Sequence, residues 1–290
     1  MKITVFTPTY NRRKTLQRLY DSLLEQTCKE FEWLVVDDGS TDETERYIES
    51  LKEDNKINIT YYKQKNKGKH IAHNRGVKMA MGELFFCVDS DDFLPNDAIK
   101  NIYDNIETLR ETDCGFISGK VDEKNNLLCS NISSSLPHVG LNKLNSIGIN
   151  GEFSFVFKTQ ILRNYLYPEI DNEKFIGESV LYDKLELSGY TLCPVPGFLT
   201  ICEYQENGLT SIFYKLMLEN PIGYKIYYKQ RIDIALTFKD RINYCLRYNA
   251  FKRLGKKNIF NYYGKYNFLV AVSYIPSFLL YLYYYKRNKY

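Results

Sequence analysis

The sequence predicts an α/β fold in which a mostly parallel sheet is flanked by helices and followed by a helical C-terminal extension. Short apolar runs rich in β-branched and aromatic residues alternate with segments of helical periodicity, the pattern of a parallel sheet wrapped by helices. Polar motifs follow the ends of the predicted strands, where open α/β sheets bind ligands. At 290 residues, 44% of them hydrophobic, the chain is long enough for a large core.

Strands and helices are expected to alternate along the first 121 residues. Each predicted strand is a β-branched or aromatic run, and each predicted helix carries apolar residues at three- and four-residue spacing. The strands are expected at 2–7, 31–37, 57–63, 83–88 and 114–121, and the helices at 13–27, 42–53, 70–81 and 96–110.

The remainder of the chain is less regular. A strand is expected at 153–158 and a short helix at 178–188, followed by two strand-like runs, TLCPV and FLTICEY. From residue 211 the pattern becomes helical and rich in Tyr and Lys. We therefore expect an α/β domain over 1–210 and a helical region over 211–290.

The net charge of +4 hides an uneven distribution. Residues 1–210 carry 24 Lys and Arg against 32 Asp and Glu, whereas residues 211–290 carry 15 against 3. Such a split indicates two surfaces with different partners. The seven cysteines contain no CxxC pair, which argues against a disulfide framework or a thiolate zinc site and favours a reducing cytoplasm. The N-terminus enters a strand-like run without the apolar segment of a signal peptide.

The stretch VDSDD places Asp89, Asp91 and Asp92 directly behind the strand 83–88. If the strand continued through them, Asp89 and Asp91 would lie on one face of the sheet and Asp92 on the other. Two carboxylates on one side form a hard oxygen site suited to Mn²⁺ or Mg²⁺, whose charge offsets their repulsion. The alternative is an acidic turn, in which Asp92 and Asn96 serve as turn or cap residues.

The stretch VVDDGSTDE follows the second strand. Ser40 and Glu43 have the spacing of a capping box, and Gly39 permits the turn before the helix. Asp37 and Asp38 remain at the carboxyl end of the strand, where a carboxylate could accept the N–H of uracil or a similar base.

The stretch NKGKHIAHNRG, residues 66–76, opens a helix with cations and glycines, a setting that binds phosphate. His70 and His73 lie three residues apart, which could suggest zinc, but no further ligand follows at suitable spacing. A polar helix face near a ligand is the favoured interpretation.

Further acidic candidates lie in the helix 178–188. Glu178 is expected in its first turn, where the helix dipole keeps it ionised, with Tyr182 near its face. The alternative is that Glu178 only stabilises the helix start. Asp183 is expected to project elsewhere as a surface charge.

These motifs, in this order, strongly resemble glycosyltransferase family 2. The resemblance covers residues 1–205 and rests on TPTYNR, VVDDGSTD, NKGKHIAHNRG, VDSDD and GES. It implies the GT-A fold with its Rossmann-like sheet, and an inverting enzyme that uses a nucleotide-sugar donor, a UDP-sugar, with Mn²⁺ or Mg²⁺.

The resemblance also implies roles for single residues. Family members that read GED or ED at the acceptor site often use the second acid as general base. This chain reads Gly177-Glu178-Ser179, which leaves Glu178 preferred and Asp183 in reserve. The implied positions are Thr7, Pro8 and Tyr10 along the nucleotide, Asp38 at the base, Lys69 and Arg75 beside the diphosphate, Asp89 at the ribose or metal, Asp91 at the metal, and Glu178 at the acceptor.

The C-terminal region favours a membrane surface. Residues 211–290 hold 15 of the 26 tyrosines, and residues 268–285 are largely apolar but interrupted by Pro276 and followed by Lys286. A span needs about 20 apolar residues, so a true span is the least favoured of three interpretations. Tyrosines beside Lys and Arg favour attachment to an anionic membrane interface, and a buried C-terminal helix pair is the third interpretation. No nucleic-acid recognition motif occurs, so no nucleic-acid partner is expected.

Attachment to the inner face of the cell membrane would suit a transferase whose acceptor is a saccharide or lipid-linked saccharide in bacterial surface-polysaccharide synthesis. One alternative is a sugar nucleotidyltransferase, but that family has a glycine-rich loop after the first strand, and TPTYNRR contains no glycine. Another is a membrane-associated scaffold with an inactive GT-A domain. The presence of Asp38, Asp89, Asp91 and Glu178 argues against the scaffold.

Overall fold

The computed structural model forms two compact units, which we describe separately. The α/β unit and the helical unit each have their own core. The structure describes residues 2–203, 213–255 and 262–287; of these, 2–166 and 189–203 form the α/β unit, and the others form the helical unit.

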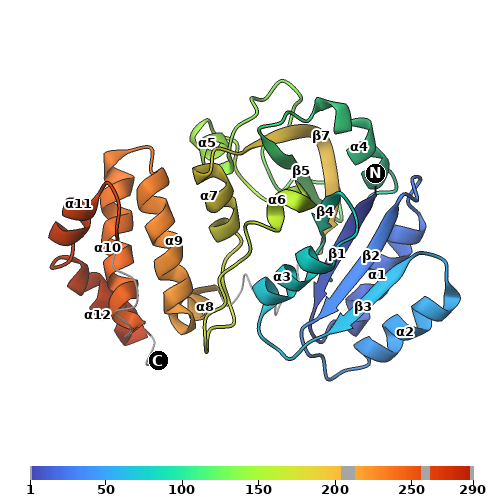
Figure 1. Ribbon diagram of the computed structural model, residues 1–290, viewed down its shortest axis with the longest axis horizontal. Coiled ribbons are helices and arrows are strands. Elements are labelled where there is room, and N and C mark those ends of the chain that lie inside the picture. Colours follow the sequence, from blue (N-terminus) through green and yellow to red (C-terminus); the bar gives the residue numbers. More distant parts are fainter. Residues whose placement is uncertain (1, 204–212, 256–261, 288–290) are drawn as a thin grey trace. The chain divides into compact units, whose positions relative to one another are not determined.

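The α/β unit is built on one seven-stranded sheet in the order β3-β2-β1-β4-β6-β5-β7 (Figure 1). All neighbouring strands are parallel except β6, which runs antiparallel to both β4 and β5. This confirms the predicted mostly parallel sheet. The strands are β1 (Ile3–Thr9), β2 (Phe31–Asp37), β3 (Ile59–Lys63), β4 (Leu84–Cys87), β5 (Asp113–Asp122), β6 (Phe153–Lys158) and β7 (Thr191–Cys202).

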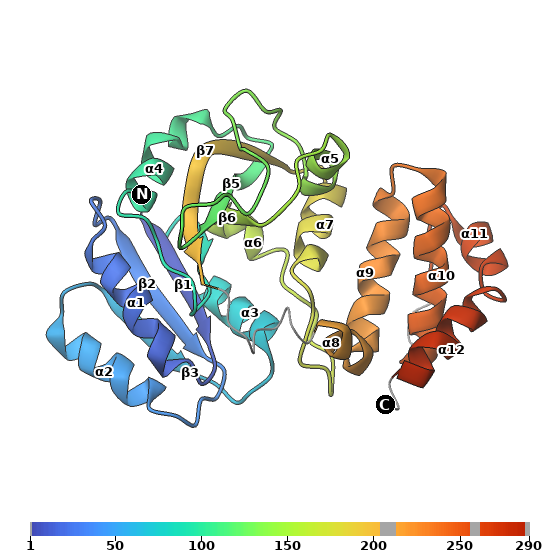
Figure 2. The same cartoon turned by 180° about the vertical axis from the view of Figure 1, so that it is seen from behind.

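Helices cover both faces of the sheet, as Figure 2 shows from behind. On one face, alternate β1 residues Ile3 and Val5 join a core with side chains of α1, α2 and α4. On the other face, α3 packs closely on β1. Gly76 allows this close approach, since a Cβ at that position would lie only 2.3 Å from the Phe6 ring. The helices are α1 (Arg13–Leu24), α2 (Thr44–Asp54), α3 (Lys69–Met79), α4 (Ala98–Asp104), α5 (Leu141–Ser146) and α6 (Thr159–Leu162).

Two predictions differ most from the structure. The helix predicted at 96–110 is shorter, because α4 ends at Asp104 and a 3₁₀ turn follows at Ile106–Thr108. The two strand-like runs TLCPV and FLTICEY contribute to the single strand β7, which ends at Cys202 and whose pairing with β5 shifts register at three places. Such irregularities depend on the neighbouring strand and are not visible in a local pattern. Tyr204, the last residue of the second run, lies outside the described residues.

The strand order positions the candidate site. Parallel strands proceed from β1 outward to β3, and the chain then returns to place β4 on the other side of β1. The order therefore reverses between β1 and β4, and in such sheets the crevice at the carboxyl ends of these strands binds ligands.

The helical unit contains α7 to α12 around a core of aromatic side chains that includes Tyr228, Tyr248 and Phe251. It also includes residues 167–188, because α7 packs against α9, whereas the sequence placed the boundary at residue 210. Within the described ranges, no helix combines the length and apolarity needed to cross a bilayer. The helices are α7 (Ser179–Leu187), α8 (Phe213–Glu219), α9 (Pro221–Ile234), α10 (Phe238–Leu254), α11 (Asn267–Val272) and α12 (Ser277–Arg287).

Candidate active site

Two carboxylates beyond β4 face cations from other elements of the α/β unit. Lys69, the first residue of α3, places its Nζ 2.7 Å from Asp89 Oδ1 and 2.9 Å from Asp89 Oδ2. Arg12, in the loop after β1, places its Nη2 3.9 Å from Asp91 Oδ2. We call Arg12, Lys69, Asp89 and Asp91 the carboxylate rim. It lies at the reversal of strand order between β1 and β4.

The structure corrects the geometry that the sequence predicted for these acids. Strand β4 ends at Cys87, and the N–H of Asp92 donates to the carbonyl of Asp89 in a turn, so the period of a strand does not apply. Asp92 is buried and pairs with Lys120 near the end of β5, at 2.9 Å between Nζ and Oδ2. Asn96 has the turn role of the predicted turn-or-cap pair, because it lies in the turn before α4 and Asp97 occupies the N-cap position.

The rim has the chemistry of a site for a hard divalent cation. Burial and the negative charge of Asp89 raise the pKa of Asp91, so the ionised form of Asp91 is disfavoured where it stands. A divalent cation at this place would relieve that repulsion. Side chains of Asp89 and Asp91 are 36% and 24% exposed, which leaves their oxygens accessible. The residues present therefore fit Mn²⁺ or Mg²⁺.

The loop after β2 braces the loop after β1. Ser40 Oγ accepts the backbone N–H of Asn11, and Asn11 Oδ1 accepts the N–H of Thr41, both at 2.8 Å. The predicted capping box of Ser40 and Glu43 is therefore wrong, since α2 begins at Thr44 without a side-chain cap. Gly39 has the predicted turn role, with a φ of 90°.

Asp38 holds the loop that leads into α3. Its Oδ1 accepts the Gln64 side-chain amide at 2.8 Å and the Lys67 N–H at 2.9 Å, and its Oδ2 accepts the Gly68 N–H at 2.7 Å. The side chain is thus tied to the phosphate-binding loop predicted at 66–76. Asp37 is also buried and accepts hydrogen bonds from the Ser40 N–H and the Tyr61 hydroxyl.

The three residues predicted to line the nucleotide differ in their surroundings. Thr7 is fully buried, and its hydroxyl accepts the indole N–H of Trp33 at 3.0 Å. Pro8 is buried within β1, whereas Tyr10, just beyond the strand, is 48% exposed. Of the three, Tyr10 offers a side chain to a ligand.

Along α3, Lys69 at the N-terminal end joins the rim. Arg75 lies six residues after Lys69, about 9 Å along the helix axis, and its guanidinium stacks on Tyr62 of β3 at 4.9 Å. His73 meets the rings of Phe6 and Phe85 edge-on, and His70 is buried, which lowers its pKa to about 4. Both histidines therefore belong to the interface between α3 and the sheet.

Glu178 and Asp183 of the helical unit have opposite environments. Glu178 is exposed at the start of α7, and the Tyr182 hydroxyl donates to its Oε2 at 3.1 Å. Asp183 is buried, and its Oδ2 lies 2.9 Å from Nε of Arg231 on α9. The prediction of Asp183 as a surface charge is wrong. Burial raises its pKa to about 7 despite the opposing effect of Arg231.

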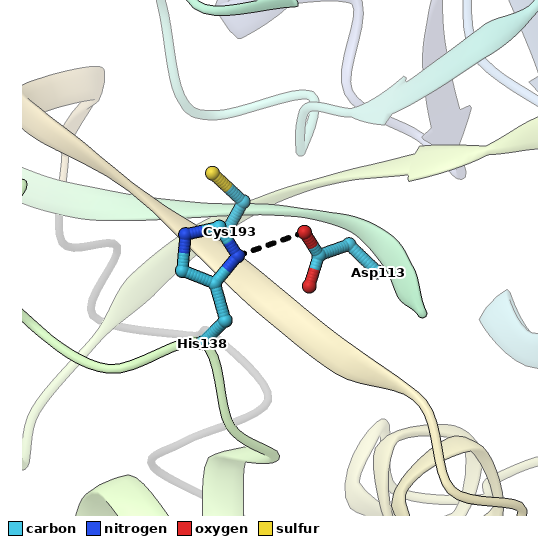
Figure 3. Close-up of side chains that lie close together, drawn as sticks. All are labelled: Asp113, His138 and Cys193. Carbon is cyan, nitrogen blue, oxygen red and sulfur yellow. Dashed lines mark hydrogen bonds and ion pairs between the residues drawn. The ribbon is translucent and has the colours of Figure 1, made fainter. Parts of the chain in front are cut away.

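A second cluster of potential ligands lies at the opposite end of β5. Asp113, His138 and Cys193 place one ligand atom each within 4.8 Å of one another, and no other such trio occurs in the described ranges (Figure 3). Spacings of 25 and 55 residues hid this cluster from sequence motifs. Nδ1 of His138 lies 2.8 Å from Asp113 Oδ2.

The chain itself satisfies this cluster. Asp113 also accepts the Arg110 N–H at 2.8 Å and the Thr191 hydroxyl at 2.5 Å. Burial raises the pKa of the Cys193 thiol, which opposes the thiolate that a metal would require. We therefore regard the cluster as a clamp between β5, β7 and the loop that carries His138.

Arg12 and Lys120 were missed as members of the carboxylate region. Arg12 belongs to TPTYNR, and Lys120 lies near the end of a strand predicted on the same edge of the sheet. Their positions could have identified them as partners, because the acids beyond β4 need nearby cations.

Comparison with known proteins relates the chain to one family. A family model described as Glycosyl transferase family 2 matches residues 4–166, more than half of the chain. An uncharacterized glycosyltransferase of Rickettsia felis is 39% identical over 99 residues, which cover 34% of this chain and 16% of that protein. A GalNAc(5)-diNAcBac-PP-undecaprenol beta-1,3-glucosyltransferase of Campylobacter jejuni is 29% identical over 194 residues, which cover 63% of this chain and 59% of that protein. The matches thus span less than two thirds of these relatives.

Solved structures share the fold. Staphylococcus aureus TarS 1–349 in complex with UDP has a TM-score of 0.60 at 20% identity, covering 100% of this chain and 93% of that chain. TarS 1–349 with UDP-GlcNAc has a TM-score of 0.62 at 19% identity, covering 99% and 92%. The mannosyltransferase PcManGT of Pyrobaculum calidifontis, with GDP-Man and Mn²⁺, has a TM-score of 0.59 at 18% identity, covering 99% and 83%. The predicted GT-A fold is confirmed.

Proposed function

This chain belongs to glycosyltransferase family 2, and from that premise we propose that it transfers a sugar from a nucleotide-diphosphate donor to a hydroxyl group of a saccharide acceptor. The observation that supports the proposal most is the carboxylate rim. There, Asp89 and Asp91 meet Lys69 and Arg12 at the reversal of strand order. A nucleotide diphosphate is bound by carboxylates that can hold a divalent cation and by cationic side chains that can bind phosphate, and the rim has both.

A UDP-sugar is the proposed donor. Structures with the same fold have been solved with UDP and with UDP-GlcNAc. Asp38 is the proposed reader of the base. Its Oδ2 accepts one of the three hydrogen bonds described above, so this oxygen keeps capacity for an N–H of the base. Tyr10 would flank the nucleotide.

The rim residues would act on the leaving diphosphate. Asp91, with Asp89, would hold Mn²⁺ or Mg²⁺, which when bound supplies Lewis-acid stabilisation of the negative charge on the departing phosphate. Lys69 and Arg12 would turn from the carboxylates to phosphate oxygens and stabilise the same charge. The charges balance in this exchange, because the metal ion supplies the positive charge that Lys69 and Arg12 no longer provide to the two carboxylates.

Glu178 is the proposed general base. The acceptor hydroxyl would lose its proton to the Glu178 carboxylate while its oxygen bonds to the anomeric carbon. The bond from that carbon to the diphosphate oxygen breaks, and the diphosphate keeps the electron pair. A single displacement of this kind inverts the anomeric configuration. Tyr182, which donates to Oε2, would orient the carboxylate.

A lipid-linked saccharide is the proposed acceptor class, in bacterial surface-polysaccharide synthesis. The Campylobacter jejuni relative is named for an acceptor on undecaprenol diphosphate. Residues 211–290 carry 15 Lys and Arg against 3 Asp and Glu, a charge that favours an anionic membrane surface. The enzyme would then work as a peripheral protein at the inner face of the membrane.

Glu178→Gln tests the base. We expect turnover to fall by about 10² to 10⁴, while the thermal shift produced by UDP and Mn²⁺ stays at the wild-type value. Glu186→Gln, the same substitution on the same helix, is the matched control and should keep wild-type turnover. Full activity of Glu178→Gln would remove Glu178 from the mechanism.

A panel of nucleotide sugars with Mn²⁺ tests the reaction class. Transfer to a saccharide, or slow donor hydrolysis that releases nucleoside diphosphate, is the expected result. Formation of a nucleotide sugar from a nucleoside triphosphate and a sugar phosphate would instead identify a nucleotidyltransferase. Inertness toward every donor and acceptor would favour the scaffold.

A further inference from the structure

Helices α11 and α12 carry apolar side chains on two sides, but only one of these sides packs into the core of the helical unit. On the inner side, Val270 and Tyr284 are buried in that core. On the outer side, large apolar side chains are exposed. They are Phe268 at 80%, Val272 at 51%, Ile275 at 81%, Leu279 at 75% and Tyr283 at 49%. We call these five residues the α11–α12 face.

The spacing of these residues explains why they gather. Successive members lie four, three, four and four residues apart, which aligns them along one side of a helix. The turn between α11 and α12 keeps helical hydrogen bonds, since Ser273 N–H donates to Leu269 and Ser277 N–H to Ser273. The α11–α12 face is therefore continuous across the break between the two helices at Pro276.

Water alone is a poor partner for this face. No charged side chain occurs between Asn267 and Tyr285. Large apolar patches on soluble proteins mark sites for proteins, ligands or membranes. Three members of the face are at least 75% exposed, so the fold leaves almost their entire side chains uncovered.

Cations border the α11–α12 face. After Asp240 the sequence contains ten Lys and Arg and no acidic residue. Arg253 stacks on Tyr274 at 3.7 Å and donates from Nη2 to the Tyr274 carbonyl at 3.0 Å. Arg247 lines a groove of about 420 Å³ together with Leu279 and Tyr283. Positive charge is thus held directly beside exposed apolar surface.

We propose that the α11–α12 face inserts into the headgroup and acyl boundary of an anionic lipid bilayer, with Arg247 and Arg253 at the phosphates. A bilayer offers acyl chains and negative charge side by side, and both match this surface. A second copy of the chain would instead oppose two strongly basic surfaces. The inference deepens the proposed function, on which its biological role rests, by naming the residues that contact the membrane.

Vesicle flotation tests the proposal with the full chain. The wild type should float with vesicles of equal parts phosphatidylglycerol and phosphatidylcholine, and less with phosphatidylcholine alone. Phe268→Ser, Ile275→Ser and Leu279→Ser combined should lower the partition coefficient by at least about 100-fold. Met81→Ser, Leu127→Ser and Ile147→Ser combined remove three apolar side chains that are 65%, 48% and 54% exposed on the α/β unit. This matched control should float like the wild type.

A fluorescence probe gives a second readout. The chain has one tryptophan, Trp33, which is buried in the α/β core. In Leu279→Trp, anionic vesicles should shift the new emission to the blue, and brominated lipids should quench it. Emission that stays unshifted and unquenched would overturn insertion.

The remaining outcomes separate this inference from its rivals. A wild type that fails to float but forms a dimer, dissociated by the triple serine variant, would overturn the membrane in favour of a second copy. Loss of flotation in the α/β control alone would place the contact elsewhere. Failure to float with intact transfer from a nucleotide sugar would overturn this inference and leave the proposed function standing. Flotation without any donor turnover would overturn the proposed function and leave the membrane contact standing.

Discussion

In the α/β unit, each of the three acids beyond β4 faces a cation from another element, whereas the helical unit leaves large apolar side chains exposed. Asp89, Asp91 and Asp92 face Lys69, Arg12 and Lys120. By contrast, Phe268 and Ile275 of the α11–α12 face are at least 80% exposed. The difference is one of chemistry. The acids can pair with the chain's own cations until a ligand takes the place of those cations. An apolar surface that binds a partner has no such substitute and stays exposed to water until the partner binds.

The two units also differ in acid–base chemistry. All three histidines belong to the α/β unit, and no acidic residue follows Asp240 in the helical unit. We expect substitutions in the rim to change turnover or the free energy of unfolding. Substitutions in the α11–α12 face should change the partition of the protein into lipid vesicles without unfolding the chain.

The largest expected effect comes from Asp91→Asn. Turnover that depends on Mn²⁺ should fall by about a thousandfold or more, because the proposed cation site loses a charged ligand. The unfolding temperature should rise slightly. Since burial and Asp89 raise the pKa of Asp91 in the folded state, ionised Asp91 costs stability at neutral pH, and neutral Asn removes this cost.

Kinetics and thermal unfolding of the same preparation check both results. Asp97→Asn, in the loop that precedes α4, is the matched control and should change neither quantity. Wild-type activity in Asp91→Asn would contradict the proposed cation site. The rim would then be a cluster of charges that stabilises the fold and binds no ligand.

The next effect is a loss of stability in Lys120→Met. The substitution leaves Asp92 buried without its cation, which should cost about 3 kcal/mol in unfolding free energy. Burial raises the pKa of Asp92 to about 6 even with Lys120 beside it. The loss should therefore be smaller near about pH 5, where protonation neutralises Asp92, and larger near about pH 8.

Urea unfolding at the two pH values measures this dependence. Lys100→Met removes a lysine from an exposed pair with Asp104 and should leave the midpoint unchanged. Equal losses at both pH values would show that Lys120 acts through packing and not through its charge.

The smallest effect at neutral pH is that of His70, because the loss in stability that it causes develops only in acid. Burial lowers the pKa of His70 to about 4 from its usual 6.5. The unfolded chain therefore binds a proton that the folded chain does not, and stability present above about pH 6.5 falls as the pH drops toward about 4, by about 1.4 kcal/mol per unit.

His70→Gln should flatten this dependence. Unfolding free energies at several pH values between these limits give the slope, and His138→Gln, at the Asp113 clamp, shows how much of it another histidine contributes. An unchanged slope in His70→Gln would contradict the buried neutral state of His70.

Several features of the site follow from local sequence patterns. Two strands were predicted with the boundaries that the structure has, β2 and β6. The position of Asp89 and Asp91 at a strand end was also predictable, because carboxyl ends of parallel strands meet at one edge of a sheet. Local periodicity reports which side of an element is apolar, and that is enough to give element type and order.

Errors arose where the outcome depended on contacts between distant segments. Ser40 has the spacing of a capping residue but binds Asn11 instead. Asp183 looked like a surface charge, yet α9 covers it and supplies Arg231. In both cases a partner 29 or more residues away outcompetes the local interaction.

The sequence by itself determined the alternation of strands and helices, the motifs at strand ends and the separation of negative and positive charge along the chain, because each is written in residue type and spacing. Only the tertiary structure decided which cation faces which acid, that Asp113, His138 and Cys193 meet, and which side of α11 and α12 remains exposed. Those outcomes depend on how segments tens of residues apart pack together, and packing is a property of the folded chain and not of any local stretch.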